Sequence, residues 1–182
     1  MRLFVAVDLN EEIRENIFGL SKILGVRGVK TVERENLHIT LKFLGEVHDS
    51  KKDRIISALD EIEFEKFRIN FKGVGYFPNA SRLRVIWVGV ENGAKELETL
   101  ANLVEDKMAE LKFKKERRFV PHATIARVKR IDSSMRSRIL KQLAEFKNEE
   151  FGEMEVGHFS LKKSTLTPFG PIYEDVKIFE LK

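Results

Sequence analysis

The sequence contains no cysteine, and this absence excludes three kinds of chemistry. Disulfides, thiolate metal sites and cysteine nucleophiles all need the missing sulfur. Long apolar runs are absent too: no stretch approaches eighteen residues, so the chain predicts no transmembrane helix. Acidic residues at Asp8, Glu11 and Glu12 closely follow the first apolar segment, which predicts no signal peptide. We therefore expect a cytoplasmic protein with no membrane partner.

Histidine is scarce, with only four copies in 182 residues. Two of them stand in the same short context, His38-Ile39-Thr40-Leu41 and His122-Ala123-Thr124-Ile125, at an offset of 84 residues. In a β-strand, residues i and i+2 point to the same face, so each motif presents an imidazole beside a hydroxyl. The repeat therefore predicts one site shared by two histidines, while His48 and His158 share no such context.

The charge balance is only mildly basic. Charged residues make up 34% of the chain, with 33 basic against 29 acidic side chains, a net charge of +4 and a pI near 9.2. A solvated surface of mixed lysine and glutamate accounts for most of this charge, so an anionic partner is permitted but not required. The apolar content of 42% is sufficient for a core.

Hydrophobic periodicity predicts alternating strands and helices. In the strand 37–44, alternation places Ile39, Leu41 and Phe43 on one face and His38, Thr40 and Lys42 on the other. A segment rich in turn formers predicts a loop at 75–81. The predicted strands cover 2–7, 37–44, 64–74, 83–90, 118–128, 151–161 and 176–181, and the predicted helices carry apolar stripes within 13–23, 55–59, 97–111 and 139–143.

The two halves of the chain align at the offset of the motifs. Ile55 falls on Ile139, Phe67 on Phe151 and Gly73 on Gly157, which indicates a duplicated β-α-β-α-β unit. We expect an α+β fold of two pseudo-symmetric split-βαβ (ferredoxin-like) lobes, with antiparallel sheets facing a central cleft. Residues 1–182 would form a single bilobal domain, with the first lobe mainly 1–80, the second mainly 81–182, and strand exchange between them left open.

The composition of the motifs favours phosphate chemistry over metal binding. Metal sites usually recruit a third protein ligand, and neither motif has an Asp or Glu at ligand spacing. Threonine is a poor zinc ligand but donates a hydrogen bond to a phosphate oxygen. Histidine, with a pKa near 6.5, can supply a neutral base and a protonated acid, each worth roughly 10²–10⁴ in rate. These residues fit metal-independent, in-line displacement at a phosphodiester.

Several segments together resemble the two-histidine (2H) phosphoesterase superfamily, and within it the family of RNA 2′,3′-cyclic phosphodiesterases, also called 2′-5′ RNA ligases. The matching segments are 2–9, 38–45, 77–79 with 85–90, 121–127, and 164–168 with Gly170. The resemblance implies a bilobal fold with a central cleft. It also implies metal-independent opening of a 2′,3′-cyclic phosphate to a 2′-phosphomonoester, with no cofactor.

The resemblance also assigns roles to the motif residues. It implies that His38 is the proton donor and His122 the proton acceptor, while Thr40 and Thr124 bind the phosphate. Near-symmetry of the two motifs gives the sequence itself no means of deciding which histidine is acid and which is base.

Two residues lie five positions beyond the histidines, Phe43 and Arg127. The resemblance implies that Phe43 stacks on a nucleobase and that Arg127 contacts the phosphate. In a regular strand, a residue at an odd offset from the histidine points to the opposite face. Either each strand bulges or ends before this residue, or Phe43 is a core residue and Arg127 a surface residue.

The expected partner is RNA with a 2′,3′-cyclic phosphate end, tRNA fragments included, and the expected state is a monomer without metal. Two alternatives stay open: ATP-independent, reversible 2′-5′ RNA ligation at the same site, and a non-catalytic RNA-binding module. Runs of basic residues suggest an RNA-backbone track, although such runs are commonly solvated faces. The runs are Lys112, Lys114, Lys115, Arg117 and Arg118, then Lys129 and Arg130, then Lys162 and Lys163.

Overall fold

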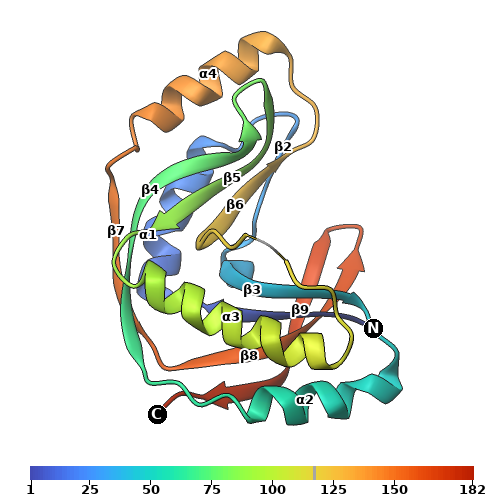
Figure 1. Ribbon diagram of the computed structural model, residues 1–182. Helices are drawn as coiled ribbons and strands as arrows, with labels where there is room; N and C mark the ends of the chain where they lie inside the picture. The colour runs from blue at the N-terminus through green and yellow to red at the C-terminus, as the bar shows by residue number, and fades with distance from the viewer. Residues whose placement is uncertain (117) are drawn as a thin grey trace.

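The computed structural model describes residues 1–116 and 118–182, so Arg117 of the first basic run lies outside the described residues. Strands and helices alternate along most of the chain, and two short 3₁₀ helices precede β3 and α2 (Figure 1). The elements are β1 (Arg2–Asp8), α1 (Glu11–Ile23), β2 (Val29–Thr31), η1 (Arg34–Asn36), β3 (His38–Glu46), η2 (Asp49–Lys51), α2 (Lys52–Asp60), β4 (Phe67–Asn79), β5 (Arg82–Val90), α3 (Ala94–Glu110), β6 (His122–Val128), α4 (Ser133–Ala144), β7 (Glu150–Val156), β8 (His158–Thr167) and β9 (Gly170–Glu180).

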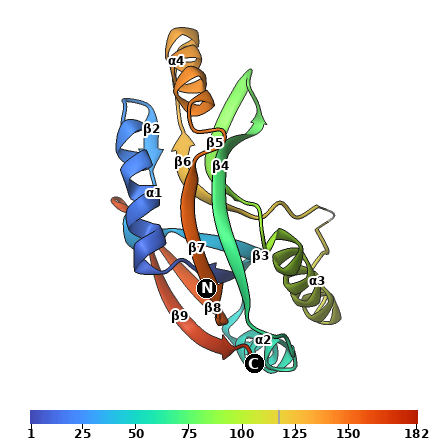
Figure 2. The same cartoon turned by 90° about the vertical axis from the view of Figure 1, so that its left-hand side faces the viewer.

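The described strands form one curled antiparallel sheet, in the order β7-β4-β5-β6-β3-β1-β8-β9, with β2 beside β6 (Figure 2). Its two halves meet between β3 and β6, which share the register pair Ile39 and Ala123. Each half takes strands from both parts of the sequence, because β4 lies with β5 to β7 while β8 and β9 lie with β1. The predicted mixed, antiparallel fold is confirmed. The lobe boundary near residue 80 stays a prediction.

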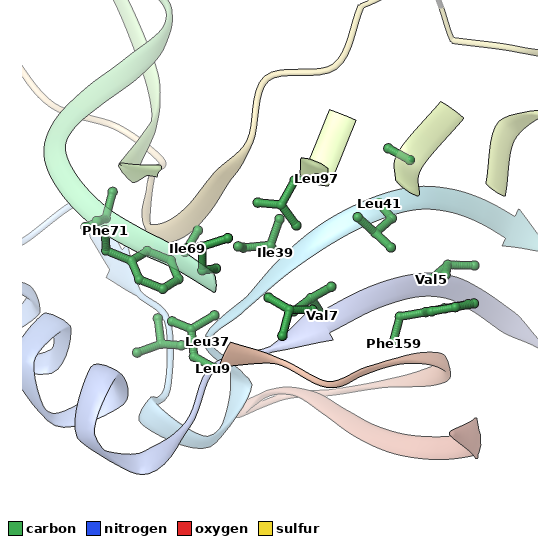
Figure 3. Close-up of a cluster of buried hydrophobic side chains, with 14 of the residues drawn as sticks. Val5, Val7, Leu9, Leu37, Ile39, Leu41, Ile69, Phe71, Leu97 and Phe159 are labelled. Carbon is green, nitrogen blue, oxygen red and sulfur yellow. The ribbon is translucent and has the colours of Figure 1, made fainter. Parts of the chain in front are cut away.

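Helices cover the face of the sheet on which the core forms. Helix α1 packs on β6 and β7, and α3 packs on β3. Figure 3 shows the centre of this core, where Ile39 and Leu41 of β3 lie near Leu97 of α3. These side chains are almost completely buried, and each contributes about 1.5–3 kcal/mol of transfer free energy. The other face of β3 presents His38 and Thr40 to the catalytic cavity.

Local sequence signals explain where α1 begins. The Asn10 side chain accepts a hydrogen bond from the backbone N–H of Ile13, as an N-cap should, and acidic residues occupy the first turn. Ile13, Ile17 and Leu20 then recur at helical spacing and are buried. None of the described helices is both long enough and apolar enough to span a bilayer.

Several predicted boundaries were wrong, among them the starts of the strands predicted at 64 and 118, which begin at 67 and 122. The predicted loop 75–81 is mostly strand, because Gly75 to Asn79 continue the ladder with β5 and only residues 80 and 81 form the turn. The predicted strand 151–161 is two strands that divide at Gly157, and the last strand begins at Gly170 rather than at 176. The missed part of β9 contains Glu174 and Asp175, as an edge strand with one unpaired side allows.

Strands β3 and β6 contain bulges at equivalent positions. Opposite β1, Thr40 and Lys42 pair with adjacent residues, so Leu41 is the extra residue. Opposite β5, Thr124 and Ala126 do the same, so the extra residue is Ile125, again at the offset of 84. A bulge reverses the alternation beyond it. The prediction that Lys42 shares a face with His38 was therefore wrong: Lys42 points into the helix-covered side and is buried.

Candidate active site

The two motifs meet at one cavity. His38 is the first residue of β3 and His122 the first residue of β6, the two strands that join the halves of the sheet. Both histidines, both motif threonines and Arg127 line a single cavity of about 110 Å³. The structure thus brings together five of the six site residues predicted from the sequence; their chemical roles stay predictions.

Both imidazoles are held in the same orientation. Nδ1 of His38 lies 2.7 Å from the carbonyl oxygen of Asn36, and Nδ1 of His122 lies 2.5 Å from that of Val120. A carbonyl oxygen can only accept, so Nδ1–H must donate in both rings. Each Nε2 is then the atom free for proton transfer. In the first motif, Nε2 of His38 lies 2.9 Å from Oγ1 of Thr40.

Burial shifts the charge state of both rings. Desolvation is the main cause that lowers the pKa of His38 and that of His122, and Arg127 lowers the pKa of each further. Hydrogen bonds to the Asn36 and Val120 carbonyls act in the opposite direction. Both histidines are therefore neutral near pH 7 in the free protein, and each Nε2 carries a lone pair.

Aromatic rings cause much of this burial. Phe4 and Tyr173 lie 5.1 and 5.4 Å from the ring of His38, measured between centroids. On the other side of the cavity, Phe77 and Trp87 lie 5.2 and 5.8 Å from the ring of His122. Each imidazole therefore has an aromatic wall and one open side that faces the cavity.

The surroundings of the two histidines differ in two charged groups, Asp8 and Lys162, which shift the pKa of His38 in opposite directions and do not shift that of His122. Asp8 is the register partner of His38 on β1, and its carboxylate raises the pKa of that histidine. Lys162 holds Asp8 at 3.1 Å and Asp175 at 2.6 Å. Lys162 is buried in this ion-pair network, so it does not belong to an exposed basic run as predicted. Among the described residues, Arg127 is the one charged group that shifts the pKa of His122.

Arg127 and Phe43 occupy equivalent positions with different outcomes. Beyond each bulge, Arg127 pairs with Val85 and Phe43 pairs with Phe4, which places both on the histidine face. Arg127 lines the cavity, whereas Phe43 lies outside it, 46% exposed, with the Arg2 guanidinium 5.2 Å above its ring. The bulge that the odd spacing required is present in both strands.

The sequence did not predict several residues that line the cavity. Lys30 enters from β2 as the register partner of Arg127, and Phe169 and Tyr173 enter from the β8–β9 hairpin. Burial raises the pKa of Tyr173, so its hydroxyl stays protonated and can donate. The Asn36 side chain donates to the Pro171 carbonyl and holds the hairpin at the site. The resemblance of 164–170 to a family segment was the available signal.

No group of three or more His, Asp or Glu side chains suited to a metal ion occurs within the described residues. The hydrogen-bond donors at the cavity include the hydroxyls of Thr40 and Thr124, the Arg127 guanidinium, the Lys30 ammonium and the Tyr173 phenol, and each imidazole can donate from Nε2 once that atom is protonated. This set suits an anion with several oxygens, because each of these groups can donate a hydrogen bond.

Comparisons with known proteins agree with this arrangement. The model of the family described as LigT like Phosphoesterase matches twice, at residues 7–87 and 88–173. The RNA 2′,3′-cyclic phosphodiesterase of Archaeoglobus fulgidus is 50% identical over 181 residues, which is 99% of this chain and all of that protein. The Methanocaldococcus jannaschii protein of the same name is 44% identical, covering 97% of this chain and 99% of that protein.

Solved structures show the same fold. The crystal structure of TT0787 of Thermus thermophilus has a TM-score of 0.84 and 30% identity, covering 99% of this chain and 97% of that one. The E. coli LigT complexed with 3′-AMP has a TM-score of 0.81 and 27% identity over the same shares. The fold and the paired motifs define a phosphoesterase of the two-histidine superfamily. Specifically, the chain belongs to the LigT-like phosphoesterase family.

Proposed function

We propose that the protein hydrolyses RNA 2′,3′-cyclic phosphate ends to 2′-phosphomonoesters, without metal. The observation that carries the proposal is the pair of imidazoles whose Nδ1 atoms are fixed by backbone carbonyls, so that both Nε2 atoms serve the same cavity. The names of the relatives from A. fulgidus and M. jannaschii describe the same reaction. A non-catalytic RNA-binding module would not need this duplicated orientation.

In the proposed reaction, Nε2 of His122 accepts a proton from water as the water oxygen attacks phosphorus. The bond between phosphorus and the 3′ oxygen breaks, and Nε2–H of His38 donates the proton to that oxygen. The hydroxyls of Thr40 and Thr124 and the guanidinium of Arg127 donate hydrogen bonds to the charged phosphate oxygens. The phosphate stays on the 2′ oxygen.

The phosphate itself adjusts the charge of the acid. An anionic phosphodiester between the rings favours their charged forms and so opposes the effect of burial on the pKa values. Asp8 gives the same support to His38 alone, and its effect on the pKa exceeds the opposite effect of Lys162. This asymmetry supports the direction in which His38 is the acid and His122 the base.

The first test measures hydrolysis of a 2′,3′-cyclic mononucleotide and of an oligonucleotide with that end. We expect a 2′-phosphomonoester from both, and losses of at least about 10²-fold in His38→Ala and in His122→Ala. His48→Ala is the matched control, because His48 is exposed and caps the 3₁₀ helix η2. A 3′-phosphomonoester, or substantial activity in either active-site variant, contradicts the mechanism.

The second test decides the direction of proton transfer through Asp8→Asn. Removal of this carboxylate lowers the pKa of His38, since Asp8 raises it, and leaves His122 unaffected. If His38 is the acid, the descending limb of kcat/KM against pH moves to lower pH while the ascending limb stays. Movement of the ascending limb instead would assign the base to His38 and reverse our assignment.

Three finer statements accompany this proposal: tRNA fragments are among the substrates, the protein acts as a monomer, and it works in the cytoplasm. Sedimentation at micromolar concentration tests the second of these directly. The alternative of 2′-5′ ligation stays a prediction, which product analysis with a second RNA strand bearing a 5′-hydroxyl would test.

A further inference from the structure

A second concavity of about 340 Å³ lies outside the catalytic cavity and is lined mostly by cations. Its walls come from β5, from the chain that follows β6, and from α4. Figures 1 and 2 show these segments together at the end of the molecule where α4 covers the β4–β5 hairpin. The basic concavity, as we call it, contains Arg82, Arg84, Lys129, Arg130 and Arg136.

The charges of the basic concavity are uncompensated. No carboxylate lines it, and none of its five cations forms an ion pair with the residues described in the structure. The nearest acid along the chain, Asp132, caps α4 by accepting from the backbone N–H of Met135. Like charges held together repel each other, and an anionic ligand relieves that repulsion. Lys129 and Arg130 belong to a predicted basic run; the three other arginines were not anticipated.

The backbone fixes the position of these cations. The backbone N–H groups of Lys129 and Arg130 both donate to the carbonyl oxygen of Gly28, at 2.7 and 3.3 Å. Gly28 has a φ of 89°, and a Cβ there would overlap the Arg130 carbonyl oxygen, so only glycine allows this approach. The fold therefore fixes the backbone that carries Lys129 and Arg130 at this wall of the basic concavity.

Strand β6 connects the basic concavity to the catalytic cavity. It runs from His122 through Arg127 to Val128, and Lys129 follows directly. At about 3.3 Å per residue, the catalytic end and the basic end are roughly 20 Å apart. Lys30, the β2 partner of Arg127, adds a cation between them. Cations thus follow one another near the end of β6, from Arg127 at the catalytic cavity to Lys129 and Arg130 at the basic concavity.

We propose that the basic concavity binds the phosphodiester backbone of RNA whose 3′ end occupies the catalytic cavity. The inference rests on the proposed function for its substrate class. Several separate cations, spread from the reacting phosphate outward, suit a chain of phosphates better than one small anion. The guanidinium group of arginine can donate two parallel hydrogen bonds to the oxygens of one phosphate. The basic concavity supplies affinity for longer RNA and has no part in the chemical step.

The test compares two double variants that remove the same charge. Arg84→Ala with Arg130→Ala removes two exposed cations of the basic concavity, whereas Arg54→Ala with Lys95→Ala removes two exposed cations on α2 and α3. Binding is measured by fluorescence anisotropy with a labelled RNA decanucleotide that ends in an unreactive 3′-hydroxyl. The measurement therefore does not depend on catalysis.

We expect the first variant to weaken RNA binding about tenfold and to reduce the slope of log K against log salt by roughly 1.4, because two phosphate contacts are lost. The control variant should bind as the wild type does. Hydrolysis of the cyclic mononucleotide should be unchanged in both. Unchanged binding in the first variant, equal loss in the control, or impaired mononucleotide hydrolysis would overturn the inference.

The two proposals fail in different ways. If the wild type does not hydrolyse cyclic ends but binds RNA through Arg84 and Arg130, the proposed function fails and the basic concavity stands. If the wild type hydrolyses cyclic ends and RNA affinity does not change when Arg84 and Arg130 are replaced, only the proposed role of the basic concavity is refuted.

Discussion

The buried ion pair between Lys42 and Glu105 offers a sharp test of how β3 is held against α3. Only 3% of the Lys42 side chain and 11% of the Glu105 side chain are exposed. Nζ of Lys42 lies 3.0 Å from both carboxylate oxygens and 2.9 Å from the carbonyl oxygen of Lys114. The carboxylate also accepts from the backbone N–H of Glu116, at 3.2 Å. The pair therefore fastens the segment that leads toward the second motif.

Replacement of Lys42 by Met should cost about 3–5 kcal/mol of unfolding free energy, because Glu105 is left as an unpaired buried charge. Adding Glu105→Leu removes that charge and recovers part of the loss. Recovery is incomplete, since the Lys114 carbonyl and the Glu116 N–H each lose a partner, at about 1–3 kcal/mol apiece. The double variant should thus be more stable than Lys42→Met alone.

Urea unfolding followed by circular dichroism measures these free energies by linear extrapolation. Lys115→Met is the control, because it breaks the exposed pair with Asp106 and should leave the midpoint unchanged. The reasoning is refuted if the double variant loses as much stability as the two single variants together, because additivity would mean that the two charges do not interact.

Three further predictions concern the site. Hydrolysis should persist after treatment with a chelator, and loss of activity that zinc restores would revive the metal alternative. Gly75→Ala should lower kcat, because its Cβ would overlap the ring of Trp87, which packs beside His122; wild-type kcat would mean that the ring position is unimportant. Phe43→Ala should raise KM for nucleotides and leave kcat unchanged, because loss of one base–aromatic stack costs about 1–3 kcal/mol of binding free energy; an unchanged KM excludes base stacking on Phe43.

Much of the site could be predicted from the sequence because the signal was local and duplicated. The spacing of His38 and Thr40 determines that they share a face in any strand, and the second motif repeats it. The position of Lys42 could not be predicted, since alternation assumes a regular strand and a bulge at Leu41 breaks it. Arg127 was predicted by resemblance alone, and the bulge at Ile125 supplies the physical reason.

The β8–β9 hairpin shows a different limit. The sequence indicates that Lys162 is a surface residue, yet carboxylates on the two strands that flank β8, β1 and β9, pair with it and allow its burial. Neither Asp8 nor Asp175 is recognisable as its partner until the chain is folded. The cavity wall formed by Tyr173 depends on the same hairpin, so this part of the site needed the tertiary structure.

The two repeats share the backbone geometry of the motif strand and differ in one side chain that the strand places on the histidine face. At the offset of 84, the carbonyl of residue 36 or 120 orients the histidine, and the bulge at residue 41 or 125 turns the residue two positions later to the same face. That residue is Phe43 in the first copy and Arg127 in the second. An aromatic ring suits a base and a guanidinium suits a phosphate, and a cyclic nucleotide offers one of each. A symmetric fold can thus hold an asymmetric substrate in one orientation.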